Sequence, residues 1–131
     1  MIGEYRTTHL IVGDPLFIAE NISDEATIVA PGISHEVIAA WEAYSDRIGL
    51  GVAADTSFRR MSAGERVAGR LLFAIAVARL RRLGAVRFLF DGTLQMISKE
   101  RLEKIKALAD AERVTCEWWR RDGLKVVEVG A

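Results

Sequence analysis

The sequence predicts a single α/β domain with a partial sheet, flanking helices and a C-terminal β-hairpin. The chain has 131 residues, within the usual range for one domain, and 50% of them are apolar while 27% are charged. Short β-branched runs alternate with segments in which apolar residues recur every three or four positions. This alternation of strand-like and helix-like segments is typical of α/β proteins.

Several other classes of protein are excluded or disfavoured. The longest unbroken apolar run covers only residues 71–78, far short of the roughly 20 residues that cross a bilayer, so no membrane span is expected. The first residues lack the basic and apolar regions of a secretory signal. Because Cys116 is the only cysteine, no internal disulfide can form, and we expect a cytoplasmic protein.

The first part of the chain predicts two strands and a helix. Residues 8–12 and 26–30 are short β-branched runs bounded by Gly, Asp or Pro, which favours strands. Ser34 is a candidate N-cap for a helix whose apolar residues follow the 3.6-residue period and which ends before Gly49.

The middle of the chain predicts a long helix followed by a buried strand. Ser62 and Glu65 form the S-x-x-E pattern of a capping box, and the apolar helix that follows is expected to stop at Gly84. Residues 86–90 are mostly apolar and end at Asp91, which indicates a buried strand that follows its helix.

The last part predicts an amphipathic helix and a hairpin. Ser98 is a candidate N-cap for the helix, and the runs 113–119 and 124–129 are strand-like. The turn between these two strands contains Asp-Gly, which favours a tight hairpin. Trp118 and Trp119 are adjacent in a strand, so their rings must point to opposite faces of the sheet.

Charge is distributed unevenly along a chain whose formal net charge is zero. Residues 1–58 hold nine acidic residues against two arginines, a net charge of −7. Residues 59–87 hold eight arginines against Glu65, a net charge of +7, and residues 88–131 balance. The arginines are either a solvated helix face or part of an anion site or charged interface, and the asymmetry leads us to expect a homodimer or hetero-oligomer.

Three segments in the middle of the chain resemble motifs of ABC-type ATPases, nearest to the chromosome-maintenance and DNA-repair branch. Met61-Ser-Ala-Gly-Glu-Arg66 is similar to the signature motif, Arg87-Phe-Leu-Phe-Asp91 to Walker B, and Gln95-Met-Ile-Ser98 to the D-loop. The closing hairpin is also similar to that branch. The resemblance covers residues 58–129 and leaves residues 1–57 as an acidic N-terminal part of the same domain.

The resemblance implies a nucleotide site that acts in trans. In the family, the signature motif contacts the γ-phosphate of ATP held by another protomer, and backbone N–H groups at a helix start suit such an anion. It implies that ATP and Mg²⁺ are held by a P-loop-bearing partner. Contact with the nucleotide would come from Ser62, Ala63, Gly64, Glu65 and Arg66; Asp91 matches the Walker B aspartate, and Gln95 and Ser98 match the D-loop. A plain capping box explains Ser62 and Glu65 without any ligand.

The chain departs from the family at each catalytic position. The first lysine is Lys99, so no P-loop precedes the signature-like motif. Asp91 is followed by Gly92, where the family has a catalytic glutamate, and both histidines precede the signature-like motif, so none serves as the switch histidine. No catalytic residue is assigned, and we do not expect ATPase activity from the chain alone. The alternative function is a nucleotide-independent protein-interaction module that retains only the fold.

Other candidate sites are weaker. His9 and His35 have no metal-ligand spacing, so no metal site is predicted, and Cys116 has no histidine placed to activate it. An outward tryptophan could stack on a nucleic-acid base, but the chain is not strongly basic and this is a weak candidate.

Overall fold

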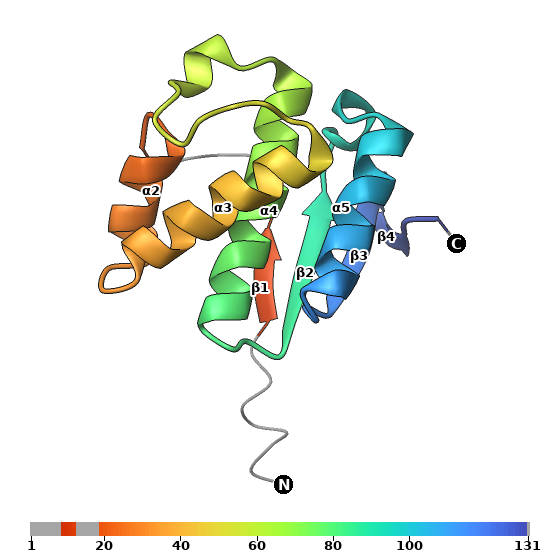
Figure 1. Ribbon diagram of the computed structural model, residues 1–131. Coiled ribbons are helices and arrows are strands. Elements are labelled where there is room, and N and C mark those ends of the chain that lie inside the picture. Colours follow the sequence, from red (N-terminus) through yellow and green to blue (C-terminus); the bar gives the residue numbers. More distant parts are fainter. Residues whose placement is uncertain (1–8, 13–18, 131) are drawn as a thin grey trace, which may run out of the picture.

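The computed structural model describes residues 9–12 and 19–130 (Figure 1). Their elements are, in chain order, β1 (His9–Val12), α2 (Ile22–Val29), α3 (Ser34–Ile48), the 3₁₀ turn η1 (Phe58–Arg60), α4 (Ala63–Leu80), β2 (Ala85–Phe90), the 3₁₀ turn η2 (Leu94–Met96), α5 (Lys99–Ala111), β3 (Cys116–Asp122) and β4 (Lys125–Glu128). The predicted α/β class, with flanking helices and a C-terminal hairpin, is confirmed.

The four strands form one sheet in the order β1-β2-β3-β4. The first three are parallel: His9 lies beside Ala85, and Val86 lies beside Cys116. The last strand returns antiparallel from β3, with Asp122 opposite Lys125. The carboxyl ends of the parallel strands therefore lie at the same edge of the sheet.

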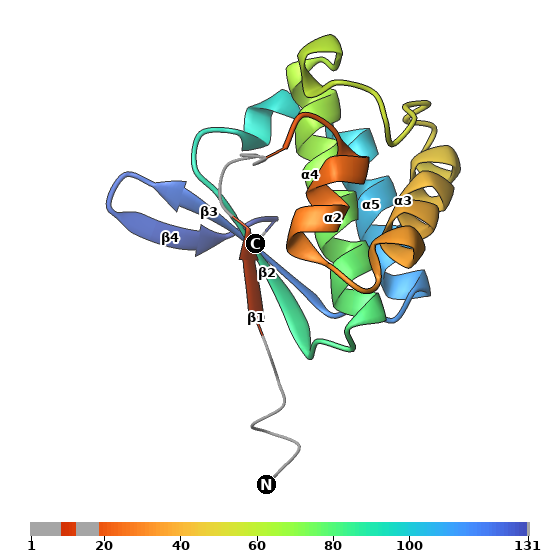
Figure 2. The ribbon, with the colours of Figure 1, turned by 90° about the vertical axis from the view of Figure 1, so that its left-hand side faces the viewer.

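The four α-helices of the described residues, α2–α5, pack on one side of this sheet, and the view from the side shows none of them on the other (Figure 2). The central helix α4 is buried from Val67 to Ala78 except at Arg70, and it contacts α3, α5, β1 and β2. Trp41 of α3 is fully buried and donates a hydrogen bond from Nε1 to the carbonyl oxygen of Gly69, at 3.0 Å. The core lies between the helices and the face of β2 that carries Val86, Phe88 and Phe90.

Among the described helices, none combines the length and the apolar character that crossing a membrane requires.

The segment 26–30 is not a strand, contrary to the sequence prediction. Residues 26–29 belong to α2, and Ala30 is its C-cap. The helix starts after Asn21, whose side chain accepts a hydrogen bond from the N–H of Asp24 at 2.8 Å. Within the helix, Ile22 and Ala26 are buried at a spacing of four, whereas Ile28 and Val29 of the β-branched run are exposed. The N-cap and the i, i+4 burial therefore outweigh the β propensity of a three-residue run.

Two predicted helix ends also differ from the structure. Ser34 is the first residue of α3 and not its N-cap, which is Ile33 and has no side-chain hydrogen bond. The long helix α4 ends at Leu80, four residues before Gly84. There, Arg82 takes the positive φ of 55° that glycine usually supplies at a helix end.

The hairpin turn lies later in the chain than predicted. The strand expected to end at Trp119 continues to Asp122, so the two-residue loop is Gly123 and Leu124, and Gly123 has a φ of 63°. The strand thus starts and ends three residues later than predicted, and in the side view the hairpin projects from the sheet on the side away from the helices (Figure 2).

Candidate functional site

The start of α4 is held by a complete capping box. Ser62 Oγ accepts a hydrogen bond from the N–H of Glu65 at 3.1 Å, and Glu65 Oε1 accepts one from the N–H of Ser62 at 2.8 Å. Arg66 turns back toward the preceding segment, where Nη1 donates to the carbonyl oxygens of Phe58 and Met61. Ser62 is exposed and Ala63 is partly exposed, so solvent reaches this helix start. Glu65 and Arg66 are occupied by contacts within the chain.

Gly64 lies in the first turn of α4 and permits a close approach of η2. A Cβ atom added at Gly64 would lie 2.5 Å from the carbonyl oxygen of Met96, a separation that side chains essentially never show. The glycine is thus required for packing within the chain. This contact joins the signature-like segment to the D-loop-like segment.

The carboxyl end of β2 leads into a polar hollow of about 350 Å³ that residues of η2 and β3 also line. It is lined by Phe90, Gly92, Leu94, Gln95, Arg120 and Arg121. Asp91 pairs with Arg121, with 3.4 Å between Oδ2 and Nε, and Arg120 pairs with Asp122 at 3.7 Å. Each of these arginines therefore faces a carboxylate, and the local charge is balanced.

The structure brings the three motif-like segments together at one edge of the sheet. The start of α4, η2 and the end of β2 all lie at the upper end in Figure 1. Ser98 caps α5, accepting from the N–H of Arg101 at 3.1 Å, so its hydroxyl has a structural role. Gln95 borders the polar hollow.

One polar group at this edge was not anticipated from the sequence. Thr93 is buried, and its hydroxyl has no hydrogen-bond partner among the described residues. Its only signal in the sequence is its place two residues after Asp91, where the predicted strand ends.

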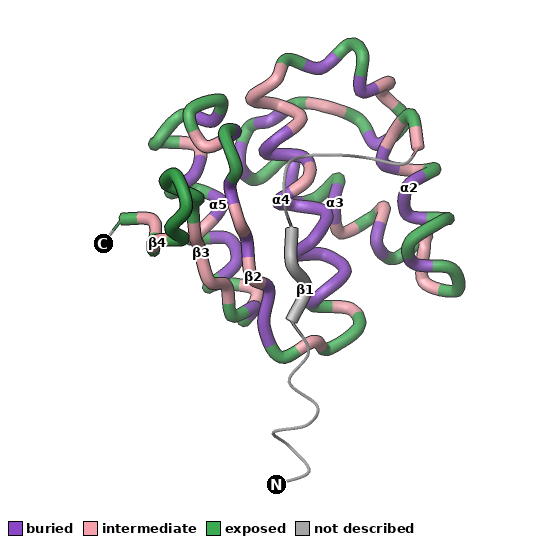
Figure 3. The backbone as a smooth tube through the Cα atoms, turned by 180° about the vertical axis from the view of Figure 1, so that it is seen from behind, coloured by how far each residue is buried: buried purple, intermediate pink, exposed green. Residues whose placement is uncertain are grey.

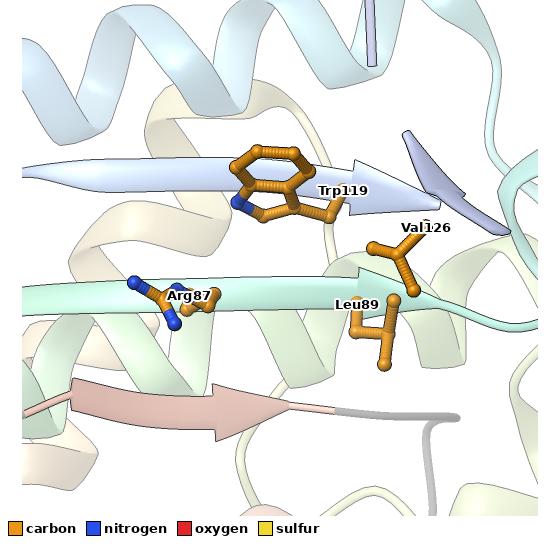
Figure 4. A pocket seen from close by; sticks show the side chains of 4 residues that line it. All are labelled: Arg87, Leu89, Trp119 and Val126. Carbon is orange, nitrogen blue, oxygen red and sulfur yellow. The ribbon is translucent and has the colours of Figure 1, made fainter. Parts of the chain in front are cut away.

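A second hollow, of about 380 Å³, lies on the sheet face away from the helices (Figure 4). It is lined by Arg87, Leu89, Trp119 and Val126. Glu117 lies beside it and receives two hydrogen bonds from Arg87, at 3.2 and 3.4 Å, and one from Trp119 Nε1 at 3.2 Å. We call the surface formed by Arg87, Leu89, Glu117, Trp119 and Val126 the open face.

The sequence predicts only part of the open face. The opposite orientation of the two tryptophans is confirmed: Trp118 stacks on Phe88 with 4.5 Å between ring centroids, and Trp119 lies on the open face. Strand β2, predicted to be buried, is buried on one face only. In the sequence, this one-sided burial is indicated by Arg87, a charged residue inside an otherwise apolar run.

The remaining sequence candidates are the two histidines and Cys116. His35 is exposed, and the side chain of His9 lies outside the described residues. The described residues contain no group of three potential metal ligands. Burial, and to a smaller extent the charge of Asp110, raises the pKa of Cys116 to about 12, which keeps the thiol protonated and unreactive at neutral pH.

The arginine-rich segment makes ion pairs within the chain. Arg79 pairs with Glu112 at 3.4 Å, and Arg87 pairs with Glu117 at 3.2 Å. Glu112 also accepts a hydrogen bond from the hydroxyl of Tyr44 at 3.0 Å. These partners belong to the balanced C-terminal part of the chain.

No protein-family model matches the chain, and no curated protein matches it.

Proposed function

We propose that this chain is a degenerate ABC-ATPase-like module that contacts ATP and Mg²⁺ held by a P-loop-bearing partner. The contact is made by the start of α4. The observation that carries the proposal is that the signature-like start of α4, the D-loop-like turn η2 and the Walker B-like Asp91 gather at one edge of the sheet, with Ser62 exposed.

The chemistry of a helix start supports an anion at this place. The first N–H groups of an α-helix have no partner within the helix, and the helix dipole adds partial positive charge there. The Ser62 cap takes up the N–H of Glu65. A phosphate oxygen of the partner's nucleotide would approach the preceding N–H groups of Ala63 and Gly64, next to the Ser62 hydroxyl.

The module is proposed to act in trans because the chain lacks its own catalytic groups. No lysine precedes Lys99, and Asp91, which a catalytic Mg²⁺ would need, already pairs with Arg121. Gly92 offers no side chain to polarise a water molecule.

A pair of substitutions at Ser62 tests the proposal. Asp and Asn cap a helix about as well as Ser, so Ser62→Asp and Ser62→Asn should leave the melting temperature nearly unchanged. Only the aspartate places a negative charge beside the proposed phosphate. In isothermal titrations with the P-loop protein that co-purifies with the chain, loaded with ATP and Mg²⁺, we expect Ser62→Asn to bind as the wild type does. Ser62→Asp should bind at least about tenfold more weakly.

Equal affinities for the two Ser62 variants would overturn the contact at the start of α4. Binding of the partner that is the same with and without nucleotide would also overturn it, and would favour the second candidate.

The second candidate is a nucleotide-independent protein-interaction module. It is favoured by the open face, where a half-buried tryptophan and an apolar hollow lie on a sheet face that no described helix covers.

A further inference from the structure

The open face has the architecture of an interface. Strands β1, β2 and β3 are parallel, and parallel sheets are almost always covered on both faces. Here α2–α5 cover only one face (Figure 2), and the view from behind shows the sheet in front of the helices (Figure 3). We propose that the open face binds the open face of a second copy of this chain. This inference deepens the second candidate function and does not depend on nucleotide.

The centre of the open face is apolar and ready to be covered. Leu89, Trp119 and Val126 come from β2, β3 and β4 and, with Arg87, line the 380 Å³ hollow (Figure 4). The only polar atom of the Trp119 ring, Nε1, already donates to Glu117. A partner that covers the ring therefore buries no unpaired donor. An unpaired buried donor would cost about 1–3 kcal/mol.

The charges of the open face favour a second copy over other partners. Arg87 and Glu117 lie side by side on neighbouring strands and form an ion pair. Arg121 and Glu128 stand opposite Val126 and Trp119 in the register and add one further charge of each sign, so the face has no net charge. A polyanion such as nucleic acid would meet a carboxylate next to each arginine. A two-fold axis through the face instead brings the Arg87 of one copy toward the Glu117 of the other, which makes the surface complementary to itself.

The arrangement of the two copies in such a dimer follows from the general geometry of packed sheets. Two sheets that pack face to face are separated by about 10 Å, with inner side chains interdigitating across the layer. The exposed β3–β4 hairpin of each copy lies beside its own open face and would flank the other copy. The edge formed by η2 and the start of α4 lies outside this layer, so Ser62 remains accessible in the dimer.

A matched pair of substitutions tests the dimer by sedimentation velocity at chain concentrations up to about 100 μM. Val126 and Ile28 have similar exposure, 50% and 53%, but Val126 lies on the open face and Ile28 on α2. We expect the wild type and Ile28→Glu to sediment as dimers. Val126→Glu should raise the dimer dissociation constant by at least about tenfold, because each copy would bury a charge in an apolar layer.

Three results would overturn the proposal: a wild type that is monomeric at every concentration, a Val126→Glu variant that dimerises as well as Ile28→Glu, or equal loss in both variants. Binding of a single-stranded oligodeoxythymidine by the wild-type monomer, lost in Val126→Glu, would assign the face to nucleic acid instead.

If Val126→Glu does not fold, the nearly isosteric Val126→Thr replaces it and should still weaken the dimer. The assay contains neither nucleotide nor P-loop partner, and Ser62→Asp should dimerise normally, so failure here is distinguishable from failure of the nucleotide contact.

Discussion

The two faces of the sheet are built from neighbouring residues and differ in almost every property. On the covered face, Phe88 is fully buried and stacks against Trp118 beneath the helices. One residue later in each strand, Leu89 and Trp119 are only half-buried and share their face with an ion pair. Side chains alternate between faces along a strand, so the position of the helices, and not the apolar character of the segment, decides which residues form the core.

The comparison predicts different costs for removing neighbouring apolar side chains. Phe88→Ala leaves a cavity in the core and should lower the free energy of unfolding by about 3–5 kcal/mol. Leu89→Ala removes a half-exposed side chain and should cost less than about 1.5 kcal/mol in an isolated chain. Both are measured by urea denaturation in the Val126→Glu background, which keeps the chain monomeric. Equal costs would mean that both faces are buried.

The reactivity of Cys116 is a second measure of the covered face. Burial raises its pKa from 9.0 to about 12, so at pH 8 the folded chain should carry roughly a thousandfold less thiolate than a thiol of ordinary pKa. Alkylation with iodoacetamide at pH 8 should therefore be at least about a hundredfold slower in buffer than in urea, where the pKa shift is lost. Similar rates in the two solutions would show that the helices do not shield β3.

The substitution Gly64→Ala tests the contact between the start of α4 and the turn η2, at the edge of the sheet. Helix propensity alone favours alanine by roughly 1 kcal/mol. The added methyl group would instead meet the carbonyl oxygen of Met96 and force η2 away from α4, so we expect a loss of about 1–3 kcal/mol in thermal or urea unfolding. Gly69→Ala is the control within the same helix, since its Cβ would lie 3.4 Å or more from its neighbours. A Gly64→Ala variant more stable than the wild type would show that α4 and η2 do not touch.

The sequence predicts those elements whose local and tertiary signals agree. The Ser62 capping box and the amphipathic helix after Ser98 are confirmed because side-chain caps and apolar periodicity indicate the same helix starts. The strand that ends before Asp91 is also confirmed in its position. The strand prediction for residues 26–30 is wrong because the Asn21 cap before this short β-branched run starts a helix. The expectation for residues 8–12 is confirmed for His9–Val12, and Thr8 lies outside the described residues.

Less of the candidate site is visible in the sequence than of the fold. The order of the motif-like segments can be read directly, but the contact between Gly64 and the carbonyl of Met96 joins residues 32 positions apart and depends on how α4 packs. The open face likewise arises because α2–α5 all lie on one side of the sheet. Two features of the sequence indicate an exposed face: Arg87 within an apolar run, and the adjacent tryptophans Trp118 and Trp119, of which one must point outward.

The most direct test of the proposed role is an ATP hydrolysis assay on the purified chain without any partner. Loss of a single preorganised catalytic donor typically costs about 10²–10³ in rate, and here the P-loop lysine, the catalytic glutamate and the switch histidine of the resembled family all lack a counterpart. We expect no phosphate release above the buffer rate, and no difference between the wild type and Asp91→Asn. Turnover that Asp91→Asn abolishes would contradict a role confined to contacting a partner's nucleotide, and turnover that survives Asp91→Asn would contradict the ABC-like assignment of β2.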